Sequence, residues 1–165
     1  MDVMDAMLGR RSVRSFIDRE VGDDIIKKVL SAGQSACNAN NLQPWEFVVV
    51  REAGVKKELA PLLKNNLKET EKVPVIIAVF CRDEKYYLED GSAATQNILN
   101  AVYGLGLGGV WVAGDKKVYA DDVRKVLKVP ESCRLVSIVA MGYPGAITEK
   151  PARKNIDEII HYDRF

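Results

Sequence analysis

The sequence is poor in the residues that build disulfide frameworks and membrane anchors. Its 3 cysteines, Cys37, Cys81 and Cys133, are odd in number and form no CxxC pair, which predicts reduced thiols and no disulfide framework. The first residues carry acidic side chains and no long hydrophobic region, so we expect no secretory signal and a cytoplasmic location. The longest apolar run, residues 73–81, is too short to span a bilayer and contains Pro74. We therefore expect a soluble protein with no membrane partner.

Net charge and histidine are also scarce. The 24 basic and 23 acidic side chains nearly cancel, so no field of the whole molecule attracts nucleic acid or an anionic membrane. The only histidine, His161, lies far along the C-terminal tail, and no His, Cys and carboxylate cluster has the spacing of a metal site or a hydrolase triad. We expect no nucleic-acid partner, no metal and no side-chain nucleophile. Any anion site must be local.

Apolar residues make up 47% of the chain, enough to bury the core of one domain over residues 1–165. Hydrophobic spacing predicts helices at 3–8, 23–30, 55–68, 90–105 and 120–128, and strands at 47–50, 73–80, 110–113 and 135–142. Asp23 and either Asp90 or Ser92 are the expected helix caps. This alternation alone favours a parallel, doubly wound sheet. The glycines at 104–109 exclude a dinucleotide fingerprint, because they follow a helix and precede a strand.

Arginine is concentrated in one short stretch, "LGRRSVRSF", at residues 8–16. Arg10, Ser12 and Arg14 alternate, so in an extended segment they face one way, and their donors suit a phosphate or another oxygen-rich anion. Arg11 then faces elsewhere. The alternative, which composition alone favours, is a solvated basic loop that pairs with nearby carboxylates. Those carboxylates are Asp18, Glu20 and Asp23.

A second stretch, "SACNANNLQPWEFVVV" at residues 35–50, places small and amide residues before a predicted strand. Such a loop is ordered, and its amides can hydrogen-bond the edge of a heteroaromatic ring. The alternative is an ordinary turn in which Trp45 anchors the core. Further along, the glycine-rich turn lets bare backbone approach a flat ligand, and we expect the N–H groups of Ala113 and Gly114 to be free to point at it.

Four stretches, in this order, resemble the FMN-dependent nitroreductase family over nearly the whole chain. "RRSVRSF" resembles the family's N-terminal arginine element, and "ACNANNLQPWEFVVV" resembles its Gln-Pro-Trp loop. "DGSAATQNILNAVYGLGLGGVWVAG" matches the helix and glycine turn that lead to the flavin edge, and "KPARKNIDEIIHYDRF" is similar to the C-terminal tail. The resemblance implies an α+β fold, a mostly antiparallel sheet flanked by helices, with each tail extending onto the partner subunit. We prefer this fold to the parallel one, because periodicity does not determine strand direction.

The resemblance also implies roles for individual residues in binding FMN. Arg10 and Ser12 would hold the phosphate and ribityl chain, and Arg14 would lie near N1 and the C2 carbonyl, where its charge favours the reduced flavin. The backbone of Ala113 and Gly114 would donate to N5 and O4 of the ring. The full expected set is Arg10, Arg11, Ser12, Arg14, Cys37, Asn38, Ala39, Asn41, Gln43, Val112, Ala113 and Gly114, with Lys150 and Arg153 completing the phosphate clamp.

The implied activity is a ping-pong oxidoreduction. NADH or NADPH passes a hydride to flavin N5 and leaves, and a nitroaromatic, quinone or similar small-molecule acceptor takes its place. The implied unit is a homodimer, since Asn41 and the rest of the 36–41 loop reach the flavin of the partner subunit. Two other classes stay open: a dehalogenase, ring oxidase or flavin-degrading member of the superfamily, and a protein that binds FMN without turnover.

Some positions depart from the family pattern or do not align with it. Cys37 and Asn38 stand where the family has Pro-Ser. We interpret Cys37 as a small buried thiol, because no resolving cysteine is near it, and Asn38 as able to substitute for the serine. Asn66 and Lys68 are candidates for the family's additional flavin-contacting Asn and Lys. The tyrosines at 86–87 either form part of a substrate rim or are ordinary exposed residues.

Overall fold

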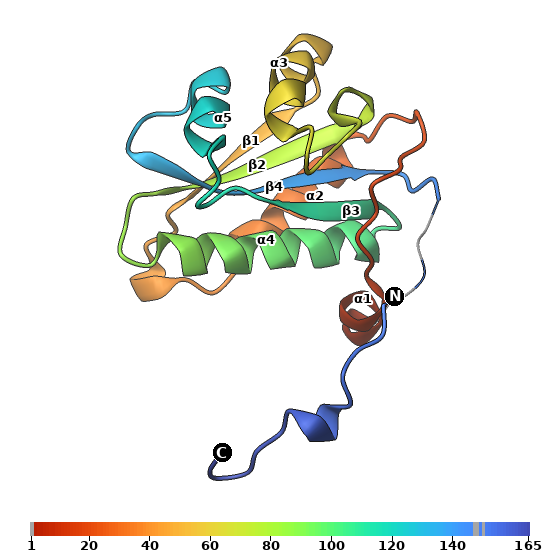
Figure 1. The fold of residues 1–165 in the computed structure, drawn as a ribbon, viewed down its shortest axis with the longest axis vertical. Coiled ribbons are helices and arrows are strands. Elements are labelled where there is room, and N and C mark those ends of the chain that lie inside the picture. Colours follow the sequence, from red (N-terminus) through yellow and green to blue (C-terminus); the bar gives the residue numbers. More distant parts are fainter. Residues whose placement is uncertain (1, 147–148, 150) are drawn as a thin grey trace.

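The computed structural model describes residues 2–146, 149 and 151–165 of the chain. Within this part the strands form one sheet in the order β1-β2-β4-β3, and every neighbouring pair is antiparallel (Figure 1). The expected α+β fold with an antiparallel sheet is confirmed, and the parallel sheet that alternation alone favours is wrong. The strands are β1 (Trp45–Val50), β2 (Val75–Arg82), β3 (Gly108–Ala113) and β4 (Cys133–Gly142).

Helices cover both faces of the sheet: α1 (Val3–Gly9), α2 (Asp23–Gln34), α3 (Ala53–Leu63), α4 (Tyr87–Gly104) and α5 (Ala120–Val126). α2 and α4 pack on one face and α3 and α5 on the other, while α1 lies against α4 (Figure 1). The central strand β2 contributes Ile77 and Val79 to the first core and Ile76 and Phe80 to the second. Because both of its faces are covered, its sequence is continuously apolar rather than alternating. No helix of the described chain is long and apolar enough to cross a membrane.

Two predicted helix boundaries are wrong near the start of the chain. α2 begins at Asp23 itself, and Gly22 occupies the cap position without a side-chain hydrogen bond, so Asp23 is not the cap. α3 ends at Leu63 rather than at residue 68. The chain turns at residues 65–66, two asparagines, whose side chains compete with the backbone for hydrogen bonds and so favour turns over helix.

The start of α4 also differs from its prediction. The helix begins at Tyr87 after a cap at Tyr86, so neither Asp90 nor Ser92 caps it. Asp90 is only 5% exposed, and its Oδ1 accepts a hydrogen bond from the backbone N–H of Ala39 at 3.0 Å. Asp90 therefore accepts a hydrogen bond from the backbone of a loop distant in the sequence and does not cap its own helix.

Glycines let α4 lie close to its neighbours. A Cβ at Gly91 would come within 2.6 Å of the Val136 side chain on β4, and a Cβ at Gly33 in α2 would come within 2.8 Å of the Ile98 side chain in α4. A larger side chain at either position would push the layers apart. α4 is therefore held tightly between α2 and the sheet.

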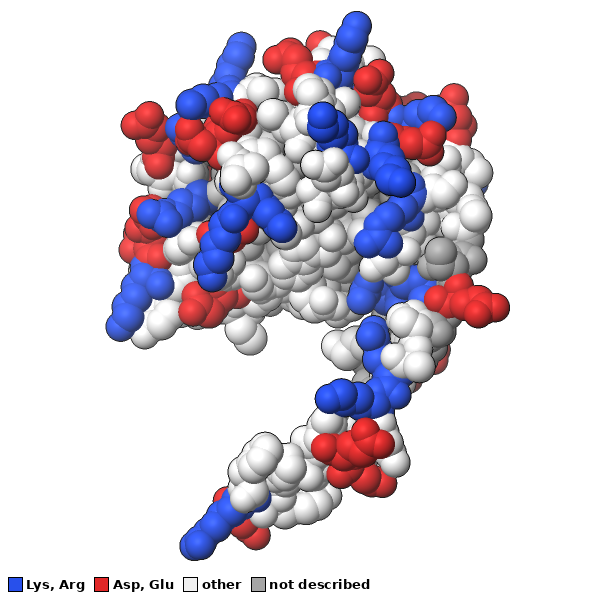
Figure 2. Space-filling model, in the orientation of Figure 1, with Lys and Arg blue, Asp and Glu red and all other residues white. Residues whose placement is uncertain are grey.

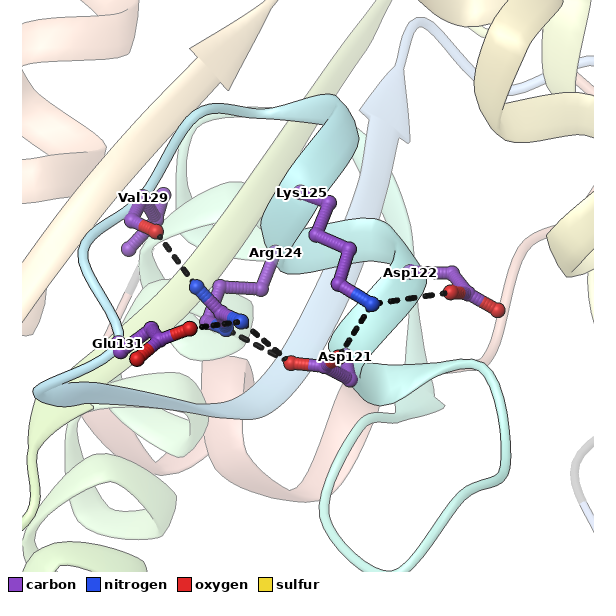
Figure 3. Close-up of polar contacts among 6 residues, drawn as sticks. All are labelled: Asp121, Asp122, Arg124, Lys125, Val129 and Glu131. Atoms are coloured by element: carbon purple, nitrogen blue, oxygen red, sulfur yellow. Dashed lines mark hydrogen bonds and ion pairs between the residues drawn. The ribbon is translucent and has the colours of Figure 1, made fainter.

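The connection between α5 and β4 is fixed by one arginine (Figure 3). Arg124, whose side chain is largely buried, donates to the Val129 carbonyl oxygen at 3.1 Å and to Asp121 Oδ1 at 2.6 Å. Lys125 Nζ reaches the other Asp121 oxygen at 2.8 Å. The hydrogen bonds from Lys125 and Arg124 lower the pKa of Asp121. This network ties the helix to the turn that leads into β4.

Candidate functional site

Residues 10–16, here called the arginine segment, run beside the beginning of β3. The Val13 N–H donates to the Gly109 carbonyl oxygen at 3.0 Å, and the Val13 side chain is buried. A Cβ at Gly108 would lie 2.8 Å from that side chain, so glycine permits the close approach. With Val13 turned into the core, the alternation of an extended chain turns its two neighbours the other way. This is the arrangement that the spacing of the segment predicts.

A cavity of about 350 Å³ opens along the arginine segment, between α1 and the start of the tail. Basic side chains crowd this part of the surface, where the N-terminal segment passes β3, and continue onto the tail (Figure 2). The cavity therefore collects, from stretches far apart in the sequence, several of the residues expected to hold a phosphate. Its charged and polar lining is Arg10, Arg11, Ser12, Arg14, Arg153 and Glu149.

The guanidinium groups of this cavity differ in what they contact. Arg11 lines the same cavity as the other arginines, so the expectation that it faces elsewhere is wrong. Its Nη1 donates to the carbonyl oxygens of Gly9 at 2.5 Å and of Arg10 at 3.1 Å, so Arg11 is bound to its own backbone. Arg10 Nε is buried and has no hydrogen-bond partner among the residues that the structure describes. Within residues 2–146, 149 and 151–165, no carboxylate forms an ion pair with Arg10, Arg14 or Arg153. Arg10, Arg14 and Arg153 are thus available to an anion.

The alternative of a basic loop neutralised by nearby carboxylates is wrong. Asp23 pairs with Arg51 at 2.6 Å instead. Neither Asp18 nor Glu20 makes an ion pair in the part of the chain that the structure describes. The positive charge of the arginine segment is left uncompensated by these three residues.

A second cavity, of about 480 Å³, adjoins the first and shares Ser12 and Arg14 with it. Asn66 and Lys68, the two candidates from the sequence, line this cavity, as does Asn65, which sequence reasoning missed. The signal for Asn65 was the Asn-Asn pair itself, which marks the turn after α3. Arg14 therefore lines both the first cavity, which is rich in guanidinium groups, and the second, which is lined by side-chain amides.

The end of β3 corrects one expectation. The Gly114 N–H is not free, because it donates to the Val136 carbonyl oxygen at 3.1 Å. The partner strand β4 begins several residues before the position opposite Ala113, so it still offers acceptors beyond the end of β3. Ala113 is exposed, and its carbonyl oxygen accepts a hydrogen bond from Tyr119 Oη. Val112 is only 3% exposed, so the structure gives a ligand almost no access to it.

Residues 37–43, here called the amide loop, hold an unusual backbone. Asn40, Asn41 and Gln43 have φ values of 52°, 54° and 46°, in the left-handed region that asparagine tolerates better than glutamine does. Asn38 Oδ1 accepts from the Gln43 N–H at 2.9 Å and closes the loop on itself. Cys37 is exposed, so the expectation of a buried thiol is wrong.

Trp45, directly after the amide loop, is 8% exposed and anchors the core, as the turn alternative expected. The loop lies at the opposite end of the sheet from the arginine segment (Figure 1). Trp45 pairs with Cys81 near the end of β2, whereas Ser12 is bridged to Gly109 at the start of β3. Since all neighbouring strands are antiparallel, the end of β2 and the start of β3 lie at opposite ends of the sheet. One chain does not bring the two predicted halves of the site together.

The C-terminal tail, residues 151–165, leaves the body of the chain and is exposed throughout (Figure 1). Arg153 lines the first cavity, while Lys150, its predicted companion, lies outside the described residues. His161 stacks on the Phe165 ring with centroids 4.1 Å apart. Several large apolar side chains along the tail pack against neither hydrophobic core of the described residues; they are Ile156, Ile159, Ile160, Tyr162 and Phe165.

Comparison with known proteins places the chain in a family. The sequence model of the Nitroreductase family matches residues 7–87 and 81–143. A protein of Methanothermobacter thermautotrophicus, named "Putative NADH dehydrogenase/NAD(P)H nitroreductase", is 33% identical over 100% of this chain and 88% of its own length. The chain therefore belongs to the nitroreductase family.

Solved structures agree with this assignment. A crystal structure from Bacteroides thetaiotaomicron, of a protein with the same name, superposes with a TM-score of 0.91 at 33% identity and covers 99% of this chain and 98% of that one. A structure named "FMN-dependent Nitroreductase" from Clostridium difficile gives a TM-score of 0.86 at 27% identity, with 98% and 99% of the two chains covered. The fold is that of the nitroreductases over the whole chain.

Proposed function

We propose that this nitroreductase-family protein is an FMN-dependent oxidoreductase that takes electrons from NADH or NADPH and passes them to small acceptors such as nitroaromatics or quinones. The observation that carries the proposal is the arginine cavity. There Arg10 Nε is buried without a described hydrogen-bond partner, and Arg14 and Arg153 form no ion pair with a described carboxylate. The names of the relatives support an oxidoreductase of this type.

The donor set of the first cavity fits the phosphate of FMN. Guanidinium groups bind phosphate through paired N–H donors, and the Ser12 hydroxyl adds another donor. A buried N–H without an acceptor costs about 1–3 kcal/mol, which a phosphate oxygen beside Arg10 Nε would recover. Glu149 lines the same cavity, but one negative charge is outweighed by the surrounding guanidinium groups. We expect Arg10, Ser12 and Arg153 to bind this end of the cofactor.

Arg14 and Lys68 suit the other end of the cofactor. Both line the second cavity together with Asn66, whose amide can donate to or accept from a heteroaromatic edge. Fixed positive charges stabilise negative charge that gathers nearby during a reaction. When bound, FMN supplies the redox chemistry, accepting a hydride from NAD(P)H and reducing the acceptor. Arg14 and Lys68 would favour the reduced, negatively charged form and so raise the reduction potential.

Ala113 and Gly114 would contribute at the reactive edge of the ring. The four residue steps from Gly109 to Ala113 extend over about 13 Å at the usual strand rise. A ring system with a phosphate-bearing chain can therefore begin at the arginine segment and end near Ala113. Because the Gly114 N–H is already used by Val136, we expect the exposed Ala113 backbone to make the principal contact.

We infer that the functional unit is a homodimer. The amide loop leads into β1 at one edge of the sheet, whereas the arginine segment and Ala113 lie along β3 at the other edge, so a second chain is needed to bring Asn41 near the cofactor. The exposed tail and the outer face of α1, with Met4 and Leu8 more than half exposed, offer the apolar surface that such a dimer buries. We propose that each tail extends onto the partner subunit.

The test is anaerobic reduction of the purified protein. We expect a yellow dimer that bleaches on addition of NADH or NADPH and regains its colour when a nitroaromatic or a quinone is added. A yellow protein that neither nucleotide bleaches would contradict the reductase activity and favour an FMN carrier or a superfamily member with another reaction. A colourless protein that binds no added FMN would contradict the whole proposal.

A further inference from the structure

The first turn of α4 contacts two segments that the proposed function assigns to the cofactor. Tyr87 and Asp90 are three residues apart, so their side chains lie on one side of the helix. Tyr87 Oη donates to Asp115 Oδ1 at 2.6 Å, and Asp90 Oδ1 accepts from the Ala39 N–H at 3.0 Å. One helical turn therefore touches both the turn after β3 and the amide loop.

The contact with Asp115 fixes the turn at the end of β3. The N–H groups of Gly114 and Asp115 both donate to the Val136 carbonyl oxygen, each at 3.1 Å, which holds the backbone. Tyr87 holds the side chain of the same turn, and the hydrogen bond to Asp115 raises the pKa of Tyr87, so the phenol keeps its proton and remains a donor. Ala113, the residue expected at the reactive edge, lies directly before this clamped pair.

Tyr87 is itself held in place. The Arg134 guanidinium lies over the Tyr87 ring with its carbon 5.2 Å from the ring centroid, and Arg134 Nε binds Asp83 Oδ1 at 2.8 Å. A side chain packed in this way keeps one rotamer and presents its hydroxyl in one direction. Such support is needed for a side chain that sets the position of another group.

The contact with Ala39 supports a strained loop. Non-glycine residues in the left-handed region, such as Asn40 and Gln43, persist only where the surroundings hold them. The buried carboxylate of Asp90 holds the beginning of this stretch, and Arg82 Nη2 holds its end by donating to the Leu42 carbonyl oxygen at 2.9 Å. The loop is preformed rather than shaped by a ligand.

We propose that Tyr87 and Asp90 are positioning residues, which together fix the turn after β3 and the amide loop in the conformations that bind the flavin. This inference rests on the proposed function, because it takes both segments to be cofactor-binding. Neither side chain needs to touch the flavin. Their removal would loosen the cofactor by letting the two segments move, while the fold, which both cores stabilise, remains.

The test compares matched variants of the full-length protein, freed of flavin and titrated with FMN. Tyr87→Phe keeps the ring and loses only the hydroxyl, and we expect FMN to bind about threefold to tenfold more weakly. Asp90→Ala removes the acceptor for Ala39, with an expected loss of about tenfold or more. Asp90→Asn keeps an oxygen that can accept the same bond, so it should restore most of the affinity. Asp23→Ala, which removes the 2.6 Å contact with Arg51 outside both segments, should bind FMN as the parent protein does.

A second measurement needs no flavin. In the flavin-free protein, amide hydrogen exchange at Ala39 should be slow in the parent and in Asp90→Asn and faster in Asp90→Ala, because the amide then loses its acceptor. Should Asp90→Ala not fold, Tyr87→Phe provides the test by its FMN affinity. Variants that are folded and bind FMN as tightly as the parent would overturn the positioning role and leave the proposed function intact. A parent protein that binds no FMN would overturn both.

Discussion

The arginine segment and the amide loop are both expected to bind the cofactor, yet they differ in how far their polar groups are already paired within the chain. In the arginine segment, Arg10 Nε is buried without an acceptor among the described residues, and Arg14 forms no ion pair with a described carboxylate. In the amide loop, backbone N–H groups find acceptors within the chain, since Asp90 accepts from the Ala39 N–H and Asn38 accepts from the Gln43 N–H. The arginine segment therefore has donors available to an anion, whereas the amide loop is already fixed in its conformation by hydrogen bonds within the chain.

The two regions also lie apart. The arginine segment is bridged to the start of β3, and the amide loop leads into the start of β1. In an antiparallel sheet of this strand order these positions are at opposite ends. A single chain therefore holds two different half-sites. In our proposal a complete site needs two chains, one contributing the guanidinium groups of its arginine segment and the other its preformed amide loop.

The largest expected effect is that of removing the tail. A chain that ends at residue 149 loses Arg153 from the first cavity and the apolar side chains that we expect to dock on the partner. We expect a monomer that retains no FMN, because the phosphate clamp and the second half-site are lost together. Light scattering and the absorbance of the purified protein would check this. A truncated chain that stays dimeric and yellow would contradict the tail docking.

The next effect concerns the charged region. We expect Arg14→Ala to weaken FMN binding by about tenfold to a hundredfold, since a charge-assisted bond contributes about 1.5–3 kcal/mol. The reduction potential of the flavin that still binds should fall, because a cation near the reduced ring is lost. Arg19→Ala is the control: Arg19 lies over the Tyr143 ring at 3.8 Å and does not line the arginine cavity. An unchanged potential in bound Arg14→Ala would refute the electrostatic role.

A smaller effect is expected in the amide loop. Asn38→Ala removes the acceptor for the Gln43 N–H and should weaken FMN binding by about threefold to tenfold, roughly the value of one neutral hydrogen bond. Asn38→Asp keeps an oxygen in the same place and should bind more nearly as the parent does. FMN titration in low and high salt sharpens the comparison: Arg14→Ala should flatten the salt dependence and Asn38→Ala should not. Equal salt dependence in both variants would contradict this difference between the arginine segment and the amide loop.

The smallest effect requires no mutation. Cys37 is exposed in the amide loop, whereas burial raises the pKa of the Cys81 thiol to about 12. At pH 8 we expect a thiol reagent to modify Cys37 and to leave Cys81 and Cys133 unmodified in the folded protein. Both are buried, and the raised pKa of Cys81 also suppresses its thiolate, which is the reacting form. Bound FMN should slow the reaction of Cys37. Mass spectrometry of the labelled peptides checks this, and modification of Cys81 or Cys133 before Cys37 would contradict the prediction.

Local patterns predicted much of this fold. The continuous apolar run of β2 reflects a strand covered on both faces, and that property is visible in one stretch of sequence. The alternation of the arginine segment likewise predicted its extended conformation. Strand direction came only from the resemblance, because a strand has the same residue pattern whichever way its neighbour runs.

The errors arose where a distant residue decides the outcome. Asp90 is a residue type that commonly caps helices, but its carboxylate accepts a hydrogen bond from the Ala39 N–H, far away in the sequence. Gly114 has a bare backbone, but β4 takes its N–H. Cys37 was expected in the core and is exposed, because the amide loop turns outward there. Asn65 joins the second cavity only because the turn after α3 folds toward Arg14.

The most direct test of two half-sites is the FMN content of mixed dimers. One chain carries Arg14→Ala, the other carries Asn38→Ala, and the two are purified together by different tags. If each site combines the arginine segment of one chain with the amide loop of the other, one of the two sites is fully parental, and we predict one tightly bound FMN per mixed dimer. If each site is built within one chain, both sites are damaged, and a mixed dimer in which neither site binds FMN with the parental affinity would contradict the account.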